Sequence, residues 1–243
     1  MTDKVDPFEF RLINDSTAYL KLKSFEGSLY NQLNRFYDSI ANKLAETPYL
    51  LIDIRNNGGG SEENYEALKK YIYSGPVKYE NLEMWVSPGN IKRYEDAEEG
   101  KRKEGGHSDG SLQRDEIIIK MMREATLYTF LPLSMPRTDT PSVIMPYPKK
   151  IVILMNRGTA SSAEGFIIFA RQSNKVILAG ENSGGYLGYG DVMTIQTPCY
   201  KYLLDITSFR TKLDPYEFTG IPPHHRLKPD QDWIKEAHKL MEN

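Results

Sequence analysis

The hydrophobic pattern of the chain changes its period within the first sixty residues. Residues 16–25 alternate apolar and polar side chains, which is the period of a half-buried strand. Residues 27–44 place apolar side chains three and four positions apart, the spacing of an amphipathic helix. Pro48 ends this helix, and residues 49–54 form a short apolar run typical of a strand covered on both faces. The order strand, helix, buried strand is therefore predicted.

The same alternation continues through the rest of the chain. Helical spacing predicts further helices over 61–73, 117–128, 162–171 and 233–241. Short apolar runs predict further strands at 151–155, 176–179 and 202–206. Helices that alternate with apolar strands favour an α/β fold, and 243 residues suffice for one domain over 1–243.

Two passages depart from this pattern. Residues 87–115 are charged and contain almost no large aliphatic side chains, which predicts a solvated excursion with the character of a mobile flap. Residues 132–148 carry five prolines and are expected to form an irregular surface loop. We find no internal repeat.

Composition narrows the classes of partner. The formal net charge is −2, with both signs interspersed, which gives no electrostatic reason to expect nucleic acid or an anionic membrane. No run of apolar residues is long enough to cross a membrane. The single cysteine, Cys199, excludes an internal disulfide framework and a cysteine-clustered zinc site. The sequence implies no metal and no organic cofactor.

The N-terminus lacks the apolar region of a secretory signal and leads directly into a predicted strand. We therefore expect that a preceding N-terminal segment is absent from this chain. The protein is extracytoplasmic if that segment includes a removed signal.

Two loops follow buried strands, at the sheet edge where reactive groups of α/β proteins gather. Residues 53–60 end in three glycines, which let backbone amides approach a substrate or simply form a tight turn. Residues 156–166 surround Ser161 with small side chains at a predicted helix start, which favours a developing negative charge there. The commoner role of a hydroxyl at this position, for Thr159 or Ser161, is to cap the helix.

Four segments in this order and spacing resemble the tail-specific, C-terminal-processing serine peptidases. They are Asp53-x-Arg55-x-Asn57-x-Gly59-Gly60, Gly158-Thr159-Ala160-Ser161-Ser162-Ala163-Glu164, Gly180-Glu181-Asn182-Ser183-Gly184-Gly185 and Gly220-Ile221-Pro222-Pro223. The resemblance covers most of the chain from Tyr49 onward. It implies an open mixed sheet with flanking helices, a ClpP/crotonase-like core.

The resemblance also implies site residues. Ser161 is the expected nucleophile, and the oxyanion hole is expected from the amide of Ser162 and an amide of the glycine loop, Gly59 before Gly60. Asp53 and Arg55 are expected to form the framework of that loop.

Three further residues complete the implied site. Gly184 and Gly185, in the second glycine turn, are expected to contact substrate. Glu217 is the best match for a carboxylate that supports the site, with a surface acid as the equal alternative.

The general base is the point at which the sequence departs from the family. The lysine that serves as base in the processing branch is replaced by Tyr186, a poor base at neutral pH, and Lys175 precedes the turn. The chain therefore resembles more closely the branch that includes the tricorn core and retinoid-binding relatives, which takes a histidine from an N-terminal segment. Because no histidine precedes His107, the base is expected upstream of Met1 or has been lost. His107, His224, His225 and His238 are expected in surface or packing positions.

Three functions remain open at this point. The first is a serine endopeptidase that trims protein or peptide substrates through an acyl-enzyme on Ser161, with an exposed strand edge able to hold the peptide. The second is a binding module for a peptide or small ligand that lacks a base. The third is an enoyl-hydratase-like acyl transformation, against which the serine placement argues.

Overall fold

The computed structural model describes residues 6–104, 108–199, 201–211 and 214–242. The chain divides into two compact units by its contacts. Unit 1 comprises residues 1–78, 138–186 and 215–243, and unit 2 comprises 79–137 and 187–214. The single domain over 1–243 stays a prediction, because a division by contacts does not test whether the units fold together.

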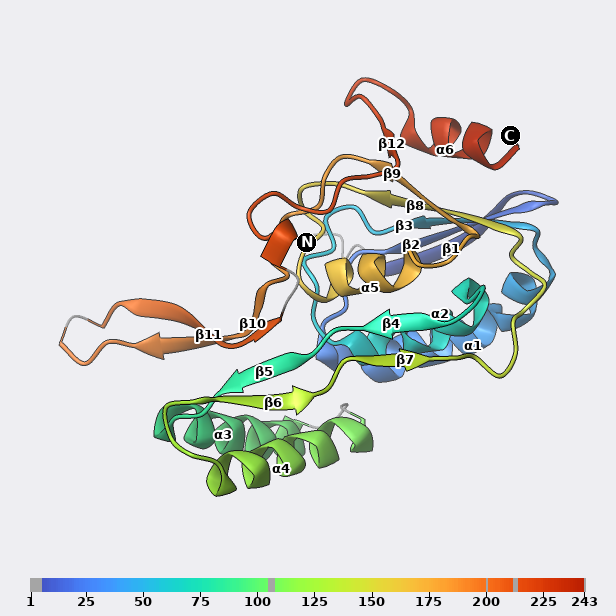
Figure 1. The fold of residues 1–243 in the computed structure, drawn as a ribbon. Coiled ribbons are helices and arrows are strands. Elements are labelled where there is room, and N and C mark those ends of the chain that lie inside the picture. The colour runs from blue at the N-terminus through green and yellow to red at the C-terminus, as the bar shows by residue number, and fades with distance from the viewer. Residues whose placement is uncertain (1–5, 105–107, 200, 212–213, 243) are drawn as a thin grey trace. The chain divides into compact units, whose positions relative to one another are not determined.

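A six-stranded mixed sheet forms the centre of unit 1 (Figure 1), in the order β1-β2-β3-β8-β9-β12. Its strands are β1 (Phe8–Asn14), β2 (Thr17–Leu22), β3 (Tyr49–Asp53), β8 (Lys150–Met155), β9 (Val176–Gly180) and β12 (His225–Arg226). Strand β1 pairs antiparallel with β2, and every other pairing in this sheet is parallel. The predicted open mixed sheet is thus confirmed.

Helices cover both faces of this sheet. They are α1 (Tyr30–Glu46), α2 (Glu66–Ile72), α5 (Ser162–Ala170) and α6 (Trp233–Glu242), with short 3-10 turns at Gly27–Leu29, Glu62–Tyr65 and Asp214–Tyr216. On one face, α6 packs Trp233, Ala237 and Met241 against side chains of the four central strands. On the other face, Phe166 of α5 contacts the rings of Phe25 and Tyr65. Figure 1 shows α5 and α6 on opposite sides of the sheet.

Unit 2 contains a four-stranded antiparallel sheet in the order β10-β11-β5-β6, with two helices. The elements are β5 (Leu82–Trp85), α3 (Pro88–Glu104), α4 (Asp109–Glu124), β6 (Phe130–Ser134), β10 (Tyr189–Gln196) and β11 (Leu203–Thr211). A two-stranded sheet of β4 (Val77–Tyr79) and β7 (Arg137–Asp139) forms where the chain leaves unit 1 and returns to it.

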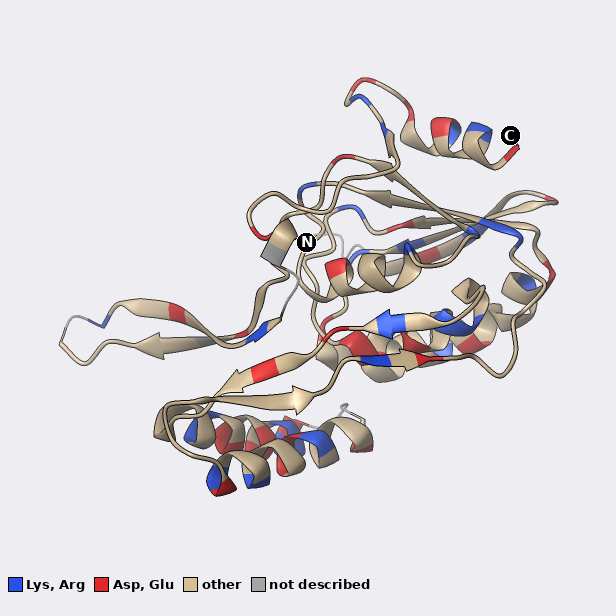
Figure 2. Cartoon of the chain, in the orientation of Figure 1, with Lys and Arg blue, Asp and Glu red and all other residues tan. Residues whose placement is uncertain are grey.

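Most described residues of the expected solvated excursion over 87–115 are helical, in α3 and the first half of α4, and no helix was predicted there from the sequence. The solvated character of the excursion stays a prediction. Helix α3 buries only Asn90 and Tyr94, so its apolar face is too small to give a periodic signal. Charged side chains stabilise the pair instead, within α3 and between α3 and α4 (Figure 2). Arg123 of α4 contacts Glu95 at 2.6 Å, and Lys101 contacts Asp115 at 2.5 Å.

The proline-rich passage also contains more regular structure than expected. Pro132 lies in β6, which is an edge strand of its sheet and therefore tolerates a residue without a backbone N–H. The expected terminal helix and the three strands expected after residue 150 are confirmed, whereas β10 and β12 have no counterpart in the sequence prediction.

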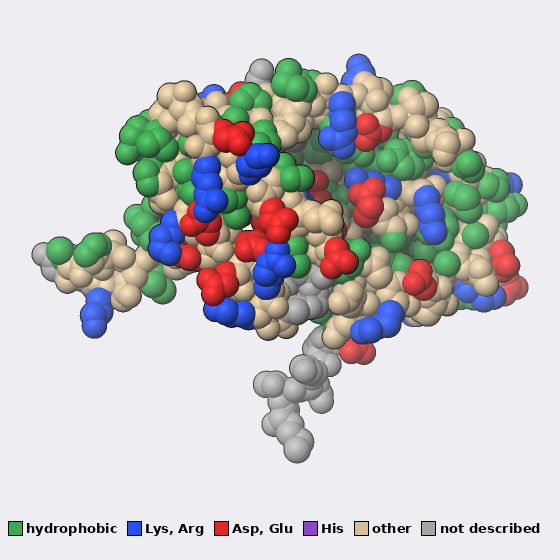
Figure 3. Space-filling view, turned by 90° about the horizontal axis from the view of Figure 1, so that it is seen from below, with side chains coloured by type: hydrophobic (Ala, Val, Ile, Leu, Met, Phe, Trp, Pro, Cys, Tyr) green, Lys and Arg blue, Asp and Glu red, His purple; other side chains and the backbone are tan. Residues whose placement is uncertain are grey.

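Neither a membrane span nor a surface patch of one charge is expected from the sequence. Among the described residues, no helix has the length and apolar character that a membrane span requires. Figure 3 shows acidic and basic side chains interspersed on the face that it displays, so that face presents no extended patch of one sign.

Candidate active site

Ser161 lies between the end of β8 and the start of α5, in a strained backbone conformation. Its φ is 54° and its ψ is −124°, values that side-chain-bearing residues rarely adopt. Such a conformation costs about 1–3 kcal/mol and persists only where the surroundings enforce it. A sharp, strained turn from strand to helix is also how α/β hydrolases expose a nucleophilic serine. The geometry thus goes beyond that of an ordinary helix cap.

Glu164 supplies the surroundings that enforce this turn. Its side chain is fully buried, and its carboxylate accepts hydrogen bonds from the backbone N–H of Ser161 at 3.0 Å, Gly185 at 2.8 Å and Tyr186 at 2.9 Å. The hydroxyl of Ser183 donates a fourth, short hydrogen bond to the same carboxylate. One buried carboxylate therefore connects the Ser161 loop to the second glycine turn.

The second glycine turn is fixed on two further sides. Gly184 N–H donates to the carbonyl of Thr159 at 2.7 Å, so the turn is bonded to the backbone of the Ser161 loop as well as to the Glu164 carboxylate. Ser183 Oγ accepts from Ile221 N–H at 2.7 Å, which adds the Gly220-Ile221 segment. The amides of Gly184 and Gly185 thus hold the loops together here, and their contact with substrate stays a prediction.

The first glycine loop lies directly against Ser161. A Cβ placed on Gly59 would approach Ser161 Cβ to 2.8 Å and Ser162 N to 2.9 Å, and Gly59 has a φ of 99°. Ser162 Oγ donates to the carbonyl of Gly60 at 2.6 Å. The structure therefore brings Gly59, Gly60, Ser161 and Ser162 together, as the sequence predicts.

The amides of this group differ in how they are engaged. Gly59 N–H donates to Asn57 Oδ1 at 3.0 Å. The hydrogen bonds among the described residues include no acceptor for the N–H of Ser162 or of Gly60. An amide at a helix start without an intrahelical partner is available to an anion. Which glycine amide completes an oxyanion hole stays a prediction.

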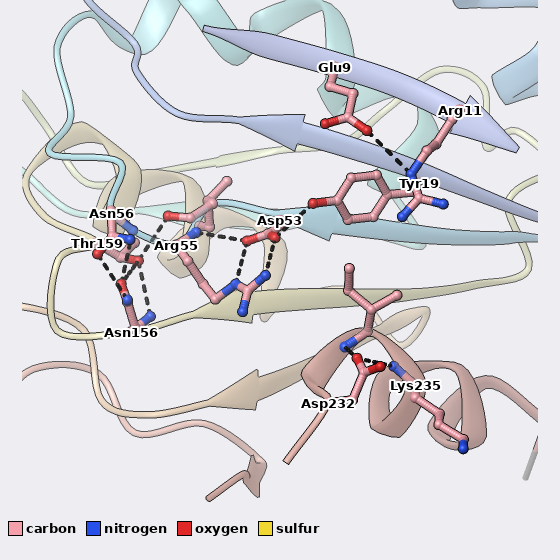
Figure 4. A network of polar contacts seen from close by, with 12 residues as sticks. Glu9, Arg11, Tyr19, Asp53, Arg55, Asn56, Asn156, Thr159, Asp232 and Lys235 are labelled. Atoms are coloured by element: carbon pink, nitrogen blue, oxygen red, sulfur yellow. Dashed lines mark hydrogen bonds and ion pairs between the residues drawn. The ribbon is translucent and has the colours of Figure 1, made fainter. Parts of the chain in front are cut away.

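Buried polar side chains hold the glycine loop in place (Figure 4). Arg55 donates to both oxygens of the Asp53 carboxylate, at 2.9 and 2.6 Å, and Tyr19 donates to it at 2.9 Å. Hydrogen bonding to Asp53 raises the pKa of Arg55, while burial and the neighbouring Asp53 raise the pKa of Tyr19. The expected framework role of Asp53 and Arg55 agrees with this geometry.

Asparagines connect the two loops, and sequence reasoning missed them. Asn156 donates to Asn56 Oδ1 at 3.0 Å and accepts from Asn56 N–H at 2.9 Å (Figure 4). The carbonyl of Asn57 accepts from Ala160 N–H at 2.9 Å. Thr159 Oγ1 donates to the carbonyl of Ile54 at 3.0 Å instead of capping α5. Sequence reasoning also missed the role of Glu164, whose available signal was the capping-box spacing Ser161-x-x-Glu164.

No lysine or histidine of the described residues forms a hydrogen bond with the Ser161 hydroxyl. Tyr186, at the family's lysine position, has a side chain that is 59% exposed. Lys175 precedes β9 and donates to the carbonyl of Met145 at 2.6 Å. Because β8 and β9 are parallel, Lys175 lies at the sheet edge opposite to the one where Ser161 follows β8.

The histidines have other partners. His224 is exposed as a residue, but its Nδ1 accepts from Leu178 N–H at 3.0 Å in a partly buried contact. This partial burial, together with Arg171 and His225, lowers the pKa of His224. His225 is exposed in β12, and His238 of α6 contacts Asn14 at 3.0 Å. These agree with the expected surface and packing positions, whereas His107 lies outside the described residues.

Glu217 lies on the turn that packs against the second glycine turn. Its neighbour Phe218 donates its N–H to the carbonyl of Gly185 at 2.9 Å. The hydrogen bonds among the described residues do not include one between Glu217 and Ser161, and a supporting role for Glu217 stays a prediction. The described residues also contain no group of three or more histidine, cysteine or acidic side chains arranged to hold a metal ion.

Comparison with known proteins places this site in context. The family model of peptidase family S41 matches residues 16–226. No curated protein sequence matches the chain. A solved candidate peptidase from Parabacteroides merdae ATCC 43184 is 17% identical, with a TM-score of 0.60 over 98% of this chain and 65% of that one.

Two further solved structures share the fold. Mature CPAF complexed with lactacystin is 17% identical, with a TM-score of 0.58 over 97% of this chain and 52% of that one. The photosystem II D1 C-terminal processing protease is 14% identical, with a TM-score of 0.52 over 99% of this chain and 53% of that one. This chain therefore spans 52% to 65% of the lengths of the three solved proteins.

Proposed function

This chain belongs to peptidase family S41, and from that premise we propose that it hydrolyses peptide bonds as a serine peptidase with Ser161 as its nucleophile. The single observation that carries the proposal is the strained conformation of Ser161 at the start of α5, against Gly59. A helix cap alone does not require a positive φ or a glycine in contact with it.

The proposed reaction proceeds through an acyl-enzyme. Ser161 Oγ loses its proton to a general base and attacks the carbonyl carbon of the peptide bond. The carbonyl oxygen of that peptide bond takes up the negative charge. The N–H of Ser162 and an N–H of the glycine loop stabilise that oxyanion. The amine leaves with a proton, and water then releases the carboxylate from Ser161.

Several residues position the reacting groups in this proposal without reacting themselves. Glu164 is a positioning residue, because it holds the N–H of Ser161 and the second glycine turn at once. We assign Glu217 the supporting carboxylate and Gly184 and Gly185 a place along the bound peptide. Substrates are peptides or proteins, consistent with the family, and trimming of protein C-termini is the finer proposal.

A second candidate function is favoured by one observation. The described residues provide no histidine or lysine that contacts the Ser161 hydroxyl. A cleft with a nucleophile but no base binds a peptide without cleaving it, which is the binding-module alternative.

The test separates these candidates by supplying a base. Peptides that differ only in a free or amidated C-terminus are incubated with the chain and with Ser161→Ala, with and without imidazole, and the products are identified by mass spectrometry. We expect cleavage of the free-carboxylate peptide that depends on Ser161 and increases with the concentration of neutral imidazole. Binding without cleavage at any imidazole concentration would favour the binding module.

A further inference from the structure

A polar cleft of about 460 Å³ opens in unit 1 where the cover of α6 ends. Parallel pairing aligns Lys21, Asp53, Leu154 and Ala179 in one row across β2, β3, β8 and β9. Two residues further on, the same sheet face carries Lys23, Arg55, Asn156 and Glu181. The sheet face thus changes from apolar to polar at its carboxyl edge, where open α/β sheets bind ligands.

The charges in this cleft do not balance. Asp53 is engaged by Arg55 at 2.6 Å and by Tyr19, so this acid is neutralised within the structure. Lys21 and Lys23 have no ion-pair partner among the described residues, and neither has Glu181. Two ammonium groups therefore face one free carboxylate, and the cleft has a net positive charge.

The remaining polar groups of the cleft are predominantly donors. The guanidinium of Arg55 uses Nε and Nη2 for Asp53 and lies 5.4 Å from the ring centroid of Trp233, which leaves Nη1 uncommitted among the described contacts. Asn56 uses its Oδ1 for Asn156, and Gln231 uses its Oε1 for Lys228 N–H, so both side-chain amides retain an NH₂ group to donate. Cationic donors with amide donors around them are the chemistry that recognises carboxylate and phosphate.

We propose that this cleft is a binding site for a small ligand with an oxyanion group, a carboxylate or a phosphate, held by Lys21, Lys23 and Arg55. The cleft shares Asn56 and Asn156 with the support of the Ser161 loop. A bound anion therefore contacts the same pair of loops that hold the nucleophile. The proposal does not depend on peptidase activity.

The test uses Ser161→Ala protein, so that binding is measured without turnover. Inorganic phosphate and N-acetylglycine are titrated separately at constant ionic strength, and the indole N–H signal of Trp233 is followed by NMR. We expect saturable binding of at least one probe, and the stronger probe identifies phosphate or carboxylate as the source. Lys21→Gln together with Lys23→Gln should weaken it at least about tenfold.

A matched control separates the cleft from general charge. Lys43→Gln removes one exposed lysine of α1, outside the cleft, and should leave the affinity unchanged. Circular dichroism checks that the double variant is folded. Failure of both probes to saturate, or equal affinity for the double variant and the parent protein, would overturn the proposal.

Discussion

One carboxylate, that of Glu164, organises the candidate site at the scale of single residues. It is fully buried and accepts four hydrogen bonds, from Ser161, Ser183, Gly185 and Tyr186. A buried charge is tolerated when every lone pair is engaged, and it is costly when one donor loses its acceptor. The position of Ser161 thus depends on a side chain one helical turn away.

Glu164→Gln tests this dependence. The amide keeps the size of the side chain but turns an NH₂ group toward donors, so we expect a loss of roughly 2–4 kcal/mol in unfolding free energy. Urea unfolding measures it, with Glu46→Gln on the exposed side of α1 as the control. A stability loss equal to that of the control would contradict the assigned role.

Adjacent glycines allow a sharper comparison. A methyl group on Gly59 would lie 2.8 Å from Ser161 Cβ, and the backbone there has a φ of 99°, which residues with a side chain rarely adopt. A methyl group on Gly58 would have no atom within 4 Å. We expect Gly59→Ala to slow the reaction of Ser161 with a serine-directed fluorophosphonate at least about tenfold, because small displacements of reacting groups are costly. Gly58→Ala should retain the parent rate. Equal rates for the two variants would contradict the expectation that Ser161 depends on a glycine at position 59.

His224 gives the fold a predictable response to pH. Burial, Arg171 and His225 lower its pKa from 6.5, so the folded protein favours the neutral ring. The unfolded chain then binds more protons, and the stability from the neutral ring, complete above pH 6.5, is lost as the pH falls through the lowered pKa. Urea midpoints at pH 7.5 and 5 should differ more for the parent than for His224→Gln. The same difference in both proteins would refute the assignment.

Elements whose stability depends on charge were the hardest to predict. Helix α3 buries two side chains, so hydrophobic periodicity could not reveal it. By contrast, β3 and β8 are buried over nearly their whole length, and α6 has a clear apolar face toward the sheet. Burial leaves a pattern in a sequence, whereas ion pairs between helices depend on a tertiary arrangement that the sequence does not display.

The ion pair of Lys101 with Asp115 stabilises the contact between α3 and α4. The Asp115 side chain is only 4% exposed, so Lys101→Met leaves a buried carboxylate without its cation. We expect a loss of roughly 2–4 kcal/mol in unfolding free energy. Lys92→Met removes an ion pair of α3 that is exposed to solvent, and it should cost far less than Lys101→Met. Unfolding in guanidinium measures the free energy of unfolding of both variants. An equal loss of unfolding free energy in the two would contradict the role of the Lys101–Asp115 pair.

Some site residues were predicted from sequence motifs, whereas the roles of others depend on contacts that form only in the folded chain. The glycine loop and the Ser161 segment were recognised by their motifs, and the family is confirmed by the match over 16–226. The roles of Glu164, Asn56 and Asn156 depend on loops that meet only in the folded chain. The branch within the family and the identity of the base stay predictions, since they depend on residues that no described contact connects to Ser161.

At the scale of the whole molecule, the candidate chemistry is confined to one unit. Ser161, the glycine loop, the second glycine turn and Glu217 all belong to unit 1, while unit 2 consists of two segments inserted into it. The polar cleft lined by Lys21, Lys23 and Arg55, proposed above to bind an anion, also belongs to unit 1. The sheet of unit 1 thus presents both sites along its carboxyl edge.

The most direct measurement of the central claim is the reaction of the intact protein with a serine-directed fluorophosphonate, with the adduct located by mass spectrometry. The account predicts one adduct, on Ser161, which is absent from Ser161→Ala and forms faster when imidazole is added. An adduct on other serines alone, or none with or without imidazole, would contradict the assignment of Ser161 as an activated nucleophile.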